Sequence, residues 1–430
     1  MMNKVLVVFL VFICALSAFS SGQKEMAAGP VTLAFWTHED PNRTKIEERY
    51  MQEFQAANPN ITVQRVTQPS KNIKDVILTA FAANEGPDIF NMEIENEYAY
   101  IVNGRVAPVD AQAFGYTSQT ALKDAYSKGV LDPVTEGGKI YGLPLELTNW
   151  CVYINNRVFK SAGLDATKSY PKTWEEMADV SDKLAIREGQ IIKRRGFDFR
   201  YPYYLTSMVP MVEQLGGDLV SADRKTAIIS DAAWIKFLTF MKDWGPNGRN
   251  LGSPTYPNAR SLFNKDNNDV AMCMSGLYQE GRIRNDNPKF YESMDWMVVP
   301  FPQFKNAARE VASNYYGHYY MVNSQKPENA RKAAWQFIAY MLKHSEEYLT
   351  TVGLIQPTKA LMASKTFKDI PYTDVFAGDM EKGHVVYFAE NSAKMQDLIR
   401  EAVESVMLAG VDPQKALATL KTKAQEIMGQ

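Results

Sequence analysis

Residues 141–156 read YGLPLELTNWCVYINN, and this stretch guides the interpretation of the rest of the chain. Its apolar residues predict a buried strand, but three polar side chains, Glu146, Thr148 and Asn149, lie in its middle. A buried polar group without a hydrogen-bond partner costs roughly 1 to 3 kcal/mol. The presence of these three side chains in an apolar strand therefore needs a physical explanation.

The chain before this stretch alternates between strand and helix patterns. Strand patterns at residues 31–36, 61–66 and 88–92 are separated by amphipathic helix patterns at about 43–57 and 72–83. Such alternation predicts an α/β fold built on a mostly parallel sheet with helices on its faces. In these sheets, ligands bind beyond the carboxyl ends of the strands.

Acidic residues follow two of these predicted strands. Glu39 and Asp40 come after the first strand, and Glu93 and Glu95 come after the third. We expect them at one edge of the sheet, where a ligand would bind. The alternative is that they are acids at helix N-termini, which the helix dipole favours, and Asp40 before Pro41 fits that alternative equally well.

Composition restricts the class of protein. The chain has 430 residues, of which 46% are hydrophobic and 22% charged, and this length predicts two or three domains. The formal net charge of -2 gives no electrostatic footprint for nucleic acid or for anionic lipid. We therefore expect no nucleic-acid partner.

Residues 1–21 have the pattern of a secretory signal peptide, with Lys4 before an apolar run and small residues after it. The run is shorter than the roughly 20 residues of a spanning helix, so a membrane anchor is the weaker alternative. A lipid anchor through Cys14 is disfavoured because bulky residues precede it. These features predict a soluble periplasmic or extracellular protein, in which Cys151 and Cys273 are expected to be buried free thiols.

Several sequence blocks carry a resemblance to a known family. The chain resembles the extracellular solute-binding proteins that serve carbohydrate ABC transporters, the relatives of maltose-binding protein. The order and spacing of the blocks, more than any one of them, make the resemblance specific. They are GPDIF (86–90), YGLPLE (141–146), YINNRVFKSAGL (153–164), PKTWEEM (171–177), LGGDLV (215–220), AMCMSGLY (271–278), WMVVPFP (296–302) and PENARKAAWQFIAYML (327–342).

The resemblance implies a two-lobed periplasmic-binding-protein-like fold of type II. Each lobe would be a mostly parallel sheet flanked by helices, and crossing hinge strands would join the lobes. The expected lobes are residues 30–146 plus 302–351 and residues 150–297 plus 355–430, with crossings near 144–150, 297–302 and 352–357. A sugar or oligosaccharide would be captured in the interlobe cleft and delivered by hinge closure to the membrane permease subunits of an ABC importer, with the binding protein acting as a monomer.

The resemblance also explains the polar residues of the opening stretch, which would face a ligand on the cleft floor. A sugar needs hydrogen-bonding groups for its hydroxyls and aromatic rings for its C–H faces. Tyr278 stands where maltose-binding protein has a tryptophan, Met92 replaces an aromatic residue and Thr148 replaces a carboxylate, so the pocket is not expected to copy the maltodextrin site. His318 could instead be a structural histidine. The expected ligand-binding residues are Trp36, Glu39, Asp40, Met92, Glu93, Glu95, Glu146, Thr148, Asn149, Tyr203, Tyr204, Tyr278, Tyr316, His318 and Tyr387.

Two other functions compete with sugar binding. Glycoside hydrolases also use carboxylates and aromatic clefts, but nothing singles out two catalytic acids, and hydrolase and nucleotide-binding motifs are missing from the sequence. A ferric-iron or other small-solute receptor could use Tyr319 and Tyr320 with His38 and a glutamate. The preferred prediction is a non-enzymatic sugar receptor without metal or cofactor.

Overall fold

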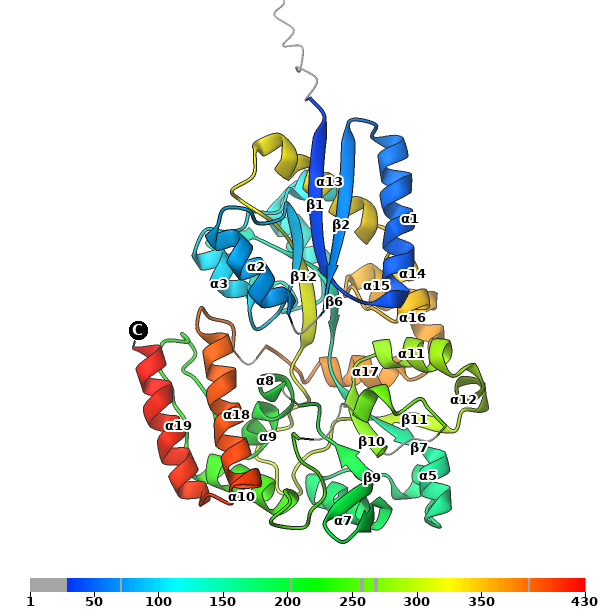
Figure 1. The fold of residues 1–430 in the computed structure, drawn as a ribbon, viewed down its shortest axis with the longest axis vertical. Helices are drawn as coiled ribbons and strands as arrows, with labels where there is room; N and C mark the ends of the chain where they lie inside the picture. Colours follow the sequence, from blue (N-terminus) through cyan, green and yellow to red (C-terminus); the bar gives the residue numbers. More distant parts are fainter. Residues whose placement is uncertain are drawn as a thin grey trace, which may run out of the picture.

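The computed structural model describes residues 29–69, 72–201, 203–255, 259–266, 270–385 and 387–429. The predicted signal peptide and Cys14 lie outside these residues. The described chain forms two five-stranded sheets and a small pair, β4 (Thr135–Glu136) with β5 (Lys139–Ile140). Figure 1 shows the two large sheets one above the other, each with helices around it.

The first sheet has the strand order β2-β1-β3-β12-β6. β1 runs parallel to β2 and β3, whereas β12 runs antiparallel to β3 and β6. Four of the five strands therefore point the same way, which confirms the mostly parallel sheet expected here. The strands are β1 (Val31–His38), β2 (Ile61–Gln68), β3 (Ile89–Glu93), β6 (Leu143–Thr148) and β12 (Tyr316–Val322).

The second sheet has the order β11-β7-β10-β9-β8. Only β9 and β10 pair in parallel, and the other three pairs are antiparallel. This sheet is more mixed than expected because β7 enters it against the direction of both its neighbours. The strands are β7 (Cys151–Asn155), β8 (Ile186–Glu188), β9 (Ile191–Asp198), β10 (Val270–Ser275) and β11 (Trp296–Val299).

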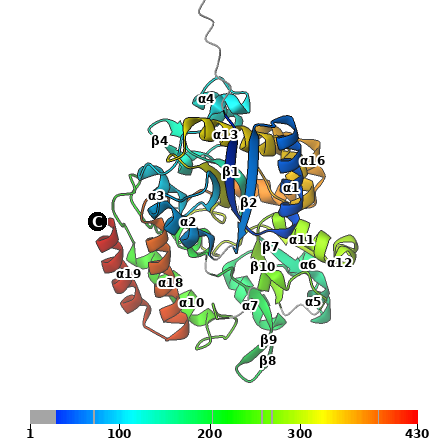
Figure 2. The same ribbon diagram turned by 45° about the horizontal axis from the view of Figure 1, so that its top comes forward.

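Helices flank both sheets, as the alternating pattern predicts, and Figure 2 shows α18 and α19 stacked beside α10 along one side of the second sheet. Around the first sheet lie α1 (Pro41–Ala57), α2 (Ile73–Ala82), α3 (Glu97–Val102), α4 (Gln119–Ala125) and α13 (Glu328–Leu342). Around the second lie α5 (Asn156–Ser161), α7 (Trp174–Leu184), α9 (Val209–Gln214), α10 (Asp231–Trp244), α11 (Tyr278–Asp286), α12 (Pro288–Ser293), α17 (Thr373–Met380), α18 (Ser392–Leu408) and α19 (Pro413–Met428). Shorter helices are α6 (Ala166–Ser169), α8 (Tyr204–Ser207), α14 (Ser345–Glu347), α15 (Lys359–Ala363) and α16 (Lys365–Asp369).

The chain passes between the two sheets within the stretch that opened the sequence analysis. β6 ends in the first sheet at Thr148, and β7 begins in the second sheet at Cys151. The chain returns through residues 300–315, which connect β11 to β12. The polar residues of the opening stretch therefore lie where the two sheets meet.

Cys151 and Cys273 are buried free thiols, as predicted. Burial raises the pKa of the Cys151 thiol and of the Cys273 thiol. Among the described residues, none of the helices has the length and apolar character needed to cross a bilayer.

Candidate functional site

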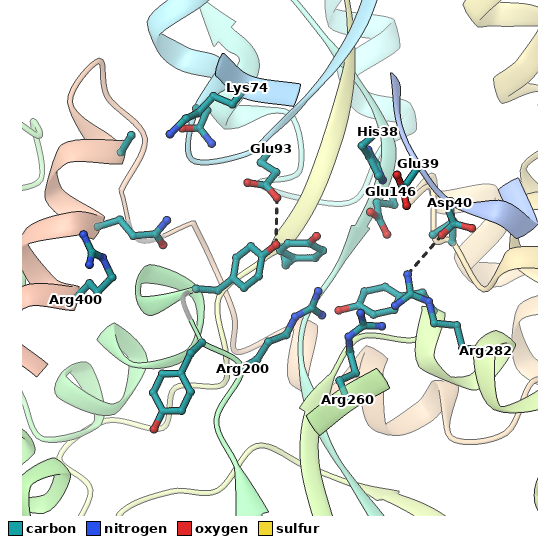
Figure 3. Close-up of a pocket in the computed structure, with 18 of the residues that line it drawn as sticks. His38, Glu39, Asp40, Lys74, Glu93, Glu146, Arg200, Arg260, Arg282 and Arg400 are labelled. Atoms are coloured by element: carbon teal, nitrogen blue, oxygen red, sulfur yellow. Dashed lines mark hydrogen bonds and ion pairs between the residues drawn. The ribbon is translucent and has the colours of Figure 1, made fainter. Parts of the chain in front are cut away.

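A cleft of about 560 Å³ lies at the strand ends where the two sheets face each other (Figure 3). β1, β3 and β6 bring residues to one wall, whereas the segments after β9 and β10 and the helix α18 bring residues to the other. Carboxyl ends of strands collect ligand-binding residues in open α/β sheets, so this cleft is the candidate site. Its lining residues are His38, Glu39, Asp40, Lys74, Glu93, Asn96, Glu146, Arg200, Tyr201, Tyr203, Arg260, Tyr278, Arg282, Tyr316, Leu354, Ala393, Gln396, Asp397 and Arg400.

Asp40 has both of the roles that the sequence left open. Its carboxylate caps α1 by accepting hydrogen bonds from the backbone N–H groups of Asn42 and Arg43 at 3.0 and 3.2 Å. The same side chain also lines the cleft and lies 3.5 Å from the guanidinium of Arg282 on the facing wall. Asp40 is thus an N-cap and, at the same time, half of a contact across the cleft.

A buried ionic group forms the floor of the cleft. Nδ1 of His318 lies 2.8 Å from Oε1 of Glu146, and its Nε2 lies 3.7 Å from Oε1 of Glu93. Burial by itself disfavours the imidazolium, but the two carboxylates outweigh it and raise the pKa of His318 to about 9. Burial likewise opposes the charge of Glu93, yet His318 lowers the pKa of this carboxyl. His318 is therefore a cation held between two carboxylates.

His38 lies beside this group but differs from it in charge. Its ring stacks on that of His318 with 4.1 Å between centroids, and its Nδ1 lies 2.6 Å from Nδ2 of Asn91. Burial and then the charge of Arg43 hold the pKa of His38 well below its usual range. A neutral imidazole thus stacks on a charged one, which avoids like-charge repulsion at close range.

Aromatic rings surround one guanidinium on the opposite wall. The guanidinium carbon of Arg200 lies 4.6 Å from the ring centroid of Trp150 and 5.0 Å from those of Tyr203 and Tyr316. The guanidinium carbon also lies 5.3 Å from the ring centroid of Tyr278, so these four rings form a cage around Arg200. Figure 3 shows Arg200 reaching toward the centre of the cleft.

Seven of the expected ligand-binding residues line the cleft, and His318 lies directly against two of them. The hydroxyl of Tyr203 donates to Oε1 of Glu93 at 3.3 Å, which makes a second contact between the walls. The strand-end rule thus brings together three of the four acids that it predicted, all but Glu95, although ligand binding by them stays a prediction. The seven are Glu39, Asp40, Glu93, Glu146, Tyr203, Tyr278 and Tyr316.

Four expected residues on or beside strands are not part of the cleft lining. Trp36 lies inside β1, two residues before its end, and packs against the core. Met92 is buried because it points to the opposite face from its neighbour Glu93. The hydroxyl of Thr148 donates to the backbone oxygen of Asn149, and both residues are buried where β6 leaves the first sheet.

Three further expected residues also have structural partners instead. Glu95 is buried and accepts a hydrogen bond from Thr206 at 3.1 Å, and burial together with the charge of Glu93 raises its pKa to about 7. Tyr204 is buried with its hydroxyl donating to Glu404 at 3.0 Å. The hydroxyl of Tyr387 donates to Asn391 before α18. The family correspondence located these positions along the chain but not the direction of their side chains.

Sequence reasoning missed the basic residues of the cleft. The lining includes five cations: Lys74, Arg200, Arg260, Arg282 and Arg400. Arg200 follows the end of β9 just as Glu39 follows the end of β1, so recognising residues 191–198 as a strand would have predicted it. The others lie on helices or loops, where a cation is ordinarily read as a solvated surface group.

One cluster in the described residues has donor atoms close enough for a metal ion. Nitrogen atoms of His38 and His318 and a carboxylate oxygen of Glu146 lie within 4.8 Å of one another. The tyrosines of the iron alternative do not join it. The hydroxyl of Tyr319 donates to the backbone oxygen of Val130 at 2.5 Å, and that of Tyr320 donates to Glu47.

Comparisons with known proteins agree with this architecture. A family model described as bacterial extracellular solute-binding protein matches residues 40–347. A putative binding protein of Brucella abortus (strain 2308) is 20% identical over 395 residues, which cover 89% of each chain. An ABC transporter solute-binding protein of Thermotoga lettingae with bound alpha-D-tagatose has a TM-score of 0.79 at 18% identity, over 92% of this chain and 99% of that one. Maltose-bound MalE3 of T. maritima also has a TM-score of 0.79 at 18% identity, over 92% of this chain and 100% of that one.

Proposed function

Since the chain belongs to the bacterial extracellular solute-binding proteins, we propose that it captures a sugar or oligosaccharide in the cleft and delivers it to an ABC importer. The observation that carries the proposal is a cleft between two sheets whose facing walls offer hydrogen-bonding side chains and tyrosine rings. The similar Thermotoga proteins with bound tagatose and maltose support it. The protein would work in the periplasm or outside the cell, as a monomer that meets the membrane permease subunits.

The cleft has the chemical groups that a sugar requires. Glu93 and Glu146 offer carboxylate oxygens, and Asn96 offers an amide, to hydroxyl groups of a ligand. Tyr201 and Tyr203 line the cleft and are only partly buried, so their rings offer apolar surface to its C–H groups. Because His318 already neutralises much of the charge of both glutamates, these can accept from uncharged hydroxyls without a bound cation.

Hinge closure would report the bound ligand to the importer. A ligand that contacts both walls stabilises the closed arrangement in proportion to its preference for that arrangement. Asp40 with Arg282 and Tyr203 with Glu93 already form direct contacts between the walls. We propose lobes of residues 30–146 plus 302–351 and 150–297 plus 355–430, with hinges near 144–150, 297–302 and 352–357.

Thermal-shift screening with mono- and oligosaccharides tests sugar capture. A ligand that binds only the native state raises the melting temperature, and small-angle scattering at saturation should show a smaller radius of gyration. Tyr278→Ala should abolish the shift, whereas Tyr170→Ala, outside the cleft lining, should keep it. Absence of a shift with every saccharide, or an unchanged radius of gyration at saturation, would contradict the proposal.

The family is one of binding proteins, and we propose that this chain has no catalytic activity. Glu93 and Glu146 share one partner, His318, and this arrangement does not set the two carboxyl groups apart as the acid and the base of a glycoside hydrolase. Release of product from aryl glycosides or oligosaccharides by the purified protein would contradict this assignment.

A further inference from the structure

The guanidinium of Arg200 is enclosed by rings yet lacks an acceptor. Its Nε and Nη1 atoms are buried, and no described residue accepts a hydrogen bond from either. Ring faces stabilise a cation, but they leave its N–H groups unpaired. A buried donor without a partner is unfavourable, and more so when it is charged. The rings therefore hold the Arg200 guanidinium in place, while its Nε and Nη1 groups have no hydrogen-bond acceptor among the described residues.

Four of the acids that line the cleft already have other partners. Glu93 and Glu146 face His318, and Asp40 caps α1 and contacts Arg282. On α18, Asp397 lies 3.2 Å from the guanidinium of Arg400. None of these carboxylates lies within ion-pair distance of Arg200, although Glu93 is close enough to be influenced by its charge. The Arg200 charge is thus uncompensated among the described residues.

Two more guanidinium groups converge on the same place. The guanidinium carbons of Arg282 and Arg260 lie 5.2 and 5.8 Å from the centroid of the Tyr278 ring, and that of Arg200 lies 5.3 Å from it. Asp40 already offsets the charge of Arg282, so the need for an anion is greatest at Arg200. An oxyanion at this place would supply the acceptors that Nε and Nη1 of Arg200 lack.

We propose that the ligand is an acidic saccharide whose oxyanion binds the Arg200 guanidinium, with Arg260 and Arg282 beside it. The inference rests on the proposed sugar capture and deepens it by naming the class of sugar. Guanidinium groups bind carboxylate and phosphate oxygens with two parallel hydrogen bonds, so the oxyanion is a uronic acid carboxylate or a sugar phosphate. The hydroxyl groups of the same ligand would face Glu93 and Glu146 on the other wall.

Calorimetric titration of the mature protein tests the inference with four ligands: digalacturonate, trigalacturonate, glucose 6-phosphate and neutral maltose. We expect one acidic ligand to bind at least tenfold more tightly than maltose, with an affinity that falls as the salt concentration rises. Galacturonate binding would identify a carboxylate site, and glucose 6-phosphate binding would identify a phosphate site.

Arg200→Met removes the charge but keeps an apolar chain in the ring cage. It should weaken binding of the acidic ligand by at least tenfold, whereas Arg200→Lys should keep part of the preference for it. Arg187→Met is the matched control, because Arg187 lies outside the cleft and pairs with Asp182 at 2.9 Å. Melting curves of all three variants establish that they are folded.

The outcomes separate this inference from the proposed function. Binding of maltose alone, or full affinity of Arg200→Met for the acidic ligand, would overturn the acidic-saccharide inference and leave sugar capture standing. Failure of all four saccharides to bind would overturn the inference, and a failure of the wider thermal-shift panel as well would overturn sugar capture.

Discussion

Replacing His318 by asparagine tests whether the floor of the cleft contains a buried cation. The imidazole contacts Glu146 at 2.8 Å and Glu93 at 3.7 Å, and asparagine keeps a polar group there without the charge. The pKa of His318 is raised from its ordinary value of 6.5 to about 9, and this difference corresponds to stabilisation on the order of 3 kcal/mol. Loss of the packing and of the neutral hydrogen bond of the imidazole adds a contribution that depends little on pH.

The sign of the pH dependence follows from the direction of the pKa shift. Because the folded state binds the proton more tightly than the unfolded state, the stabilisation is complete below about pH 6.5 and is lost as the pH rises through 9. The free energy of unfolding of His318→Asn should therefore fall furthest below wild type at pH 6. The difference should shrink by on the order of 3 kcal/mol at pH 9.5.

Urea unfolding followed by tryptophan fluorescence at pH 6, 7.5 and 9.5, without ligand, measures both proteins. His384→Asn is the matched control: His384 also contacts a glutamate, Glu213 at 3.1 Å, but its side chain is 48% exposed. The control should lose only about 0 to 1 kcal/mol. A stability difference for His318→Asn that stays constant between pH 6 and 9.5 would refute the buried imidazolium.

Three further predictions concern the proposed hinge, the cleft and the thiols. Gly353 has φ +80°, and a Cβ there would meet Tyr278 Cα at 2.9 Å, so Gly353→Ala should lower the free energy of unfolding by at least about 1 to 2 kcal/mol in the same assay. Tyr203→Phe removes the donation to Glu93 and should weaken binding in calorimetry about two- to tenfold. Cys151 and Cys273 should react with a thiol reagent only after denaturation, and rapid native labelling would contradict their burial.

Local patterns were sufficient to predict β1, β2, β3 and β6 of the first sheet, whereas β12, at Tyr316–Val322, was expected to be a loop around Gly317. The strand pattern at residues 31–36 corresponds to Val31–His38, and the one at 61–66 corresponds to Ile61–Gln68. The helix expected at 43–57 begins two residues earlier, because Asp40 caps it and Pro41 is favoured in its first turn. Hydrophobic periodicity and capping are encoded within a few residues, and this is why they could be predicted.

The second sheet and half of the site depend on contacts between distant segments. Thr148 has the right position and polarity for a cleft residue, but it is buried beside Gly276, where a Cβ would lie 2.5 Å from its methyl group. Arg282 lines the cleft because its helix, α11, directly follows β10 and begins at the facing wall. Neither packing relation has a signal within a single sequence window, so composition and spacing could not assign these residues.

Most acidic and most basic side chains lie on opposite walls of the cleft. Glu39, Asp40, Glu93 and Glu146 come from the first sheet and the segment after β1, whereas Arg200 and the other cleft arginines come from the facing elements. Without ligand the walls can attract each other only through direct contacts such as Asp40 with Arg282. A ligand with hydroxyls at one end and an oxyanion at the other would satisfy both walls in one orientation and in no other. A neutral sugar would leave Arg200 without an anionic partner in either orientation, so the order of affinities across the acidic and neutral panel should follow the charge of the ligand before its size.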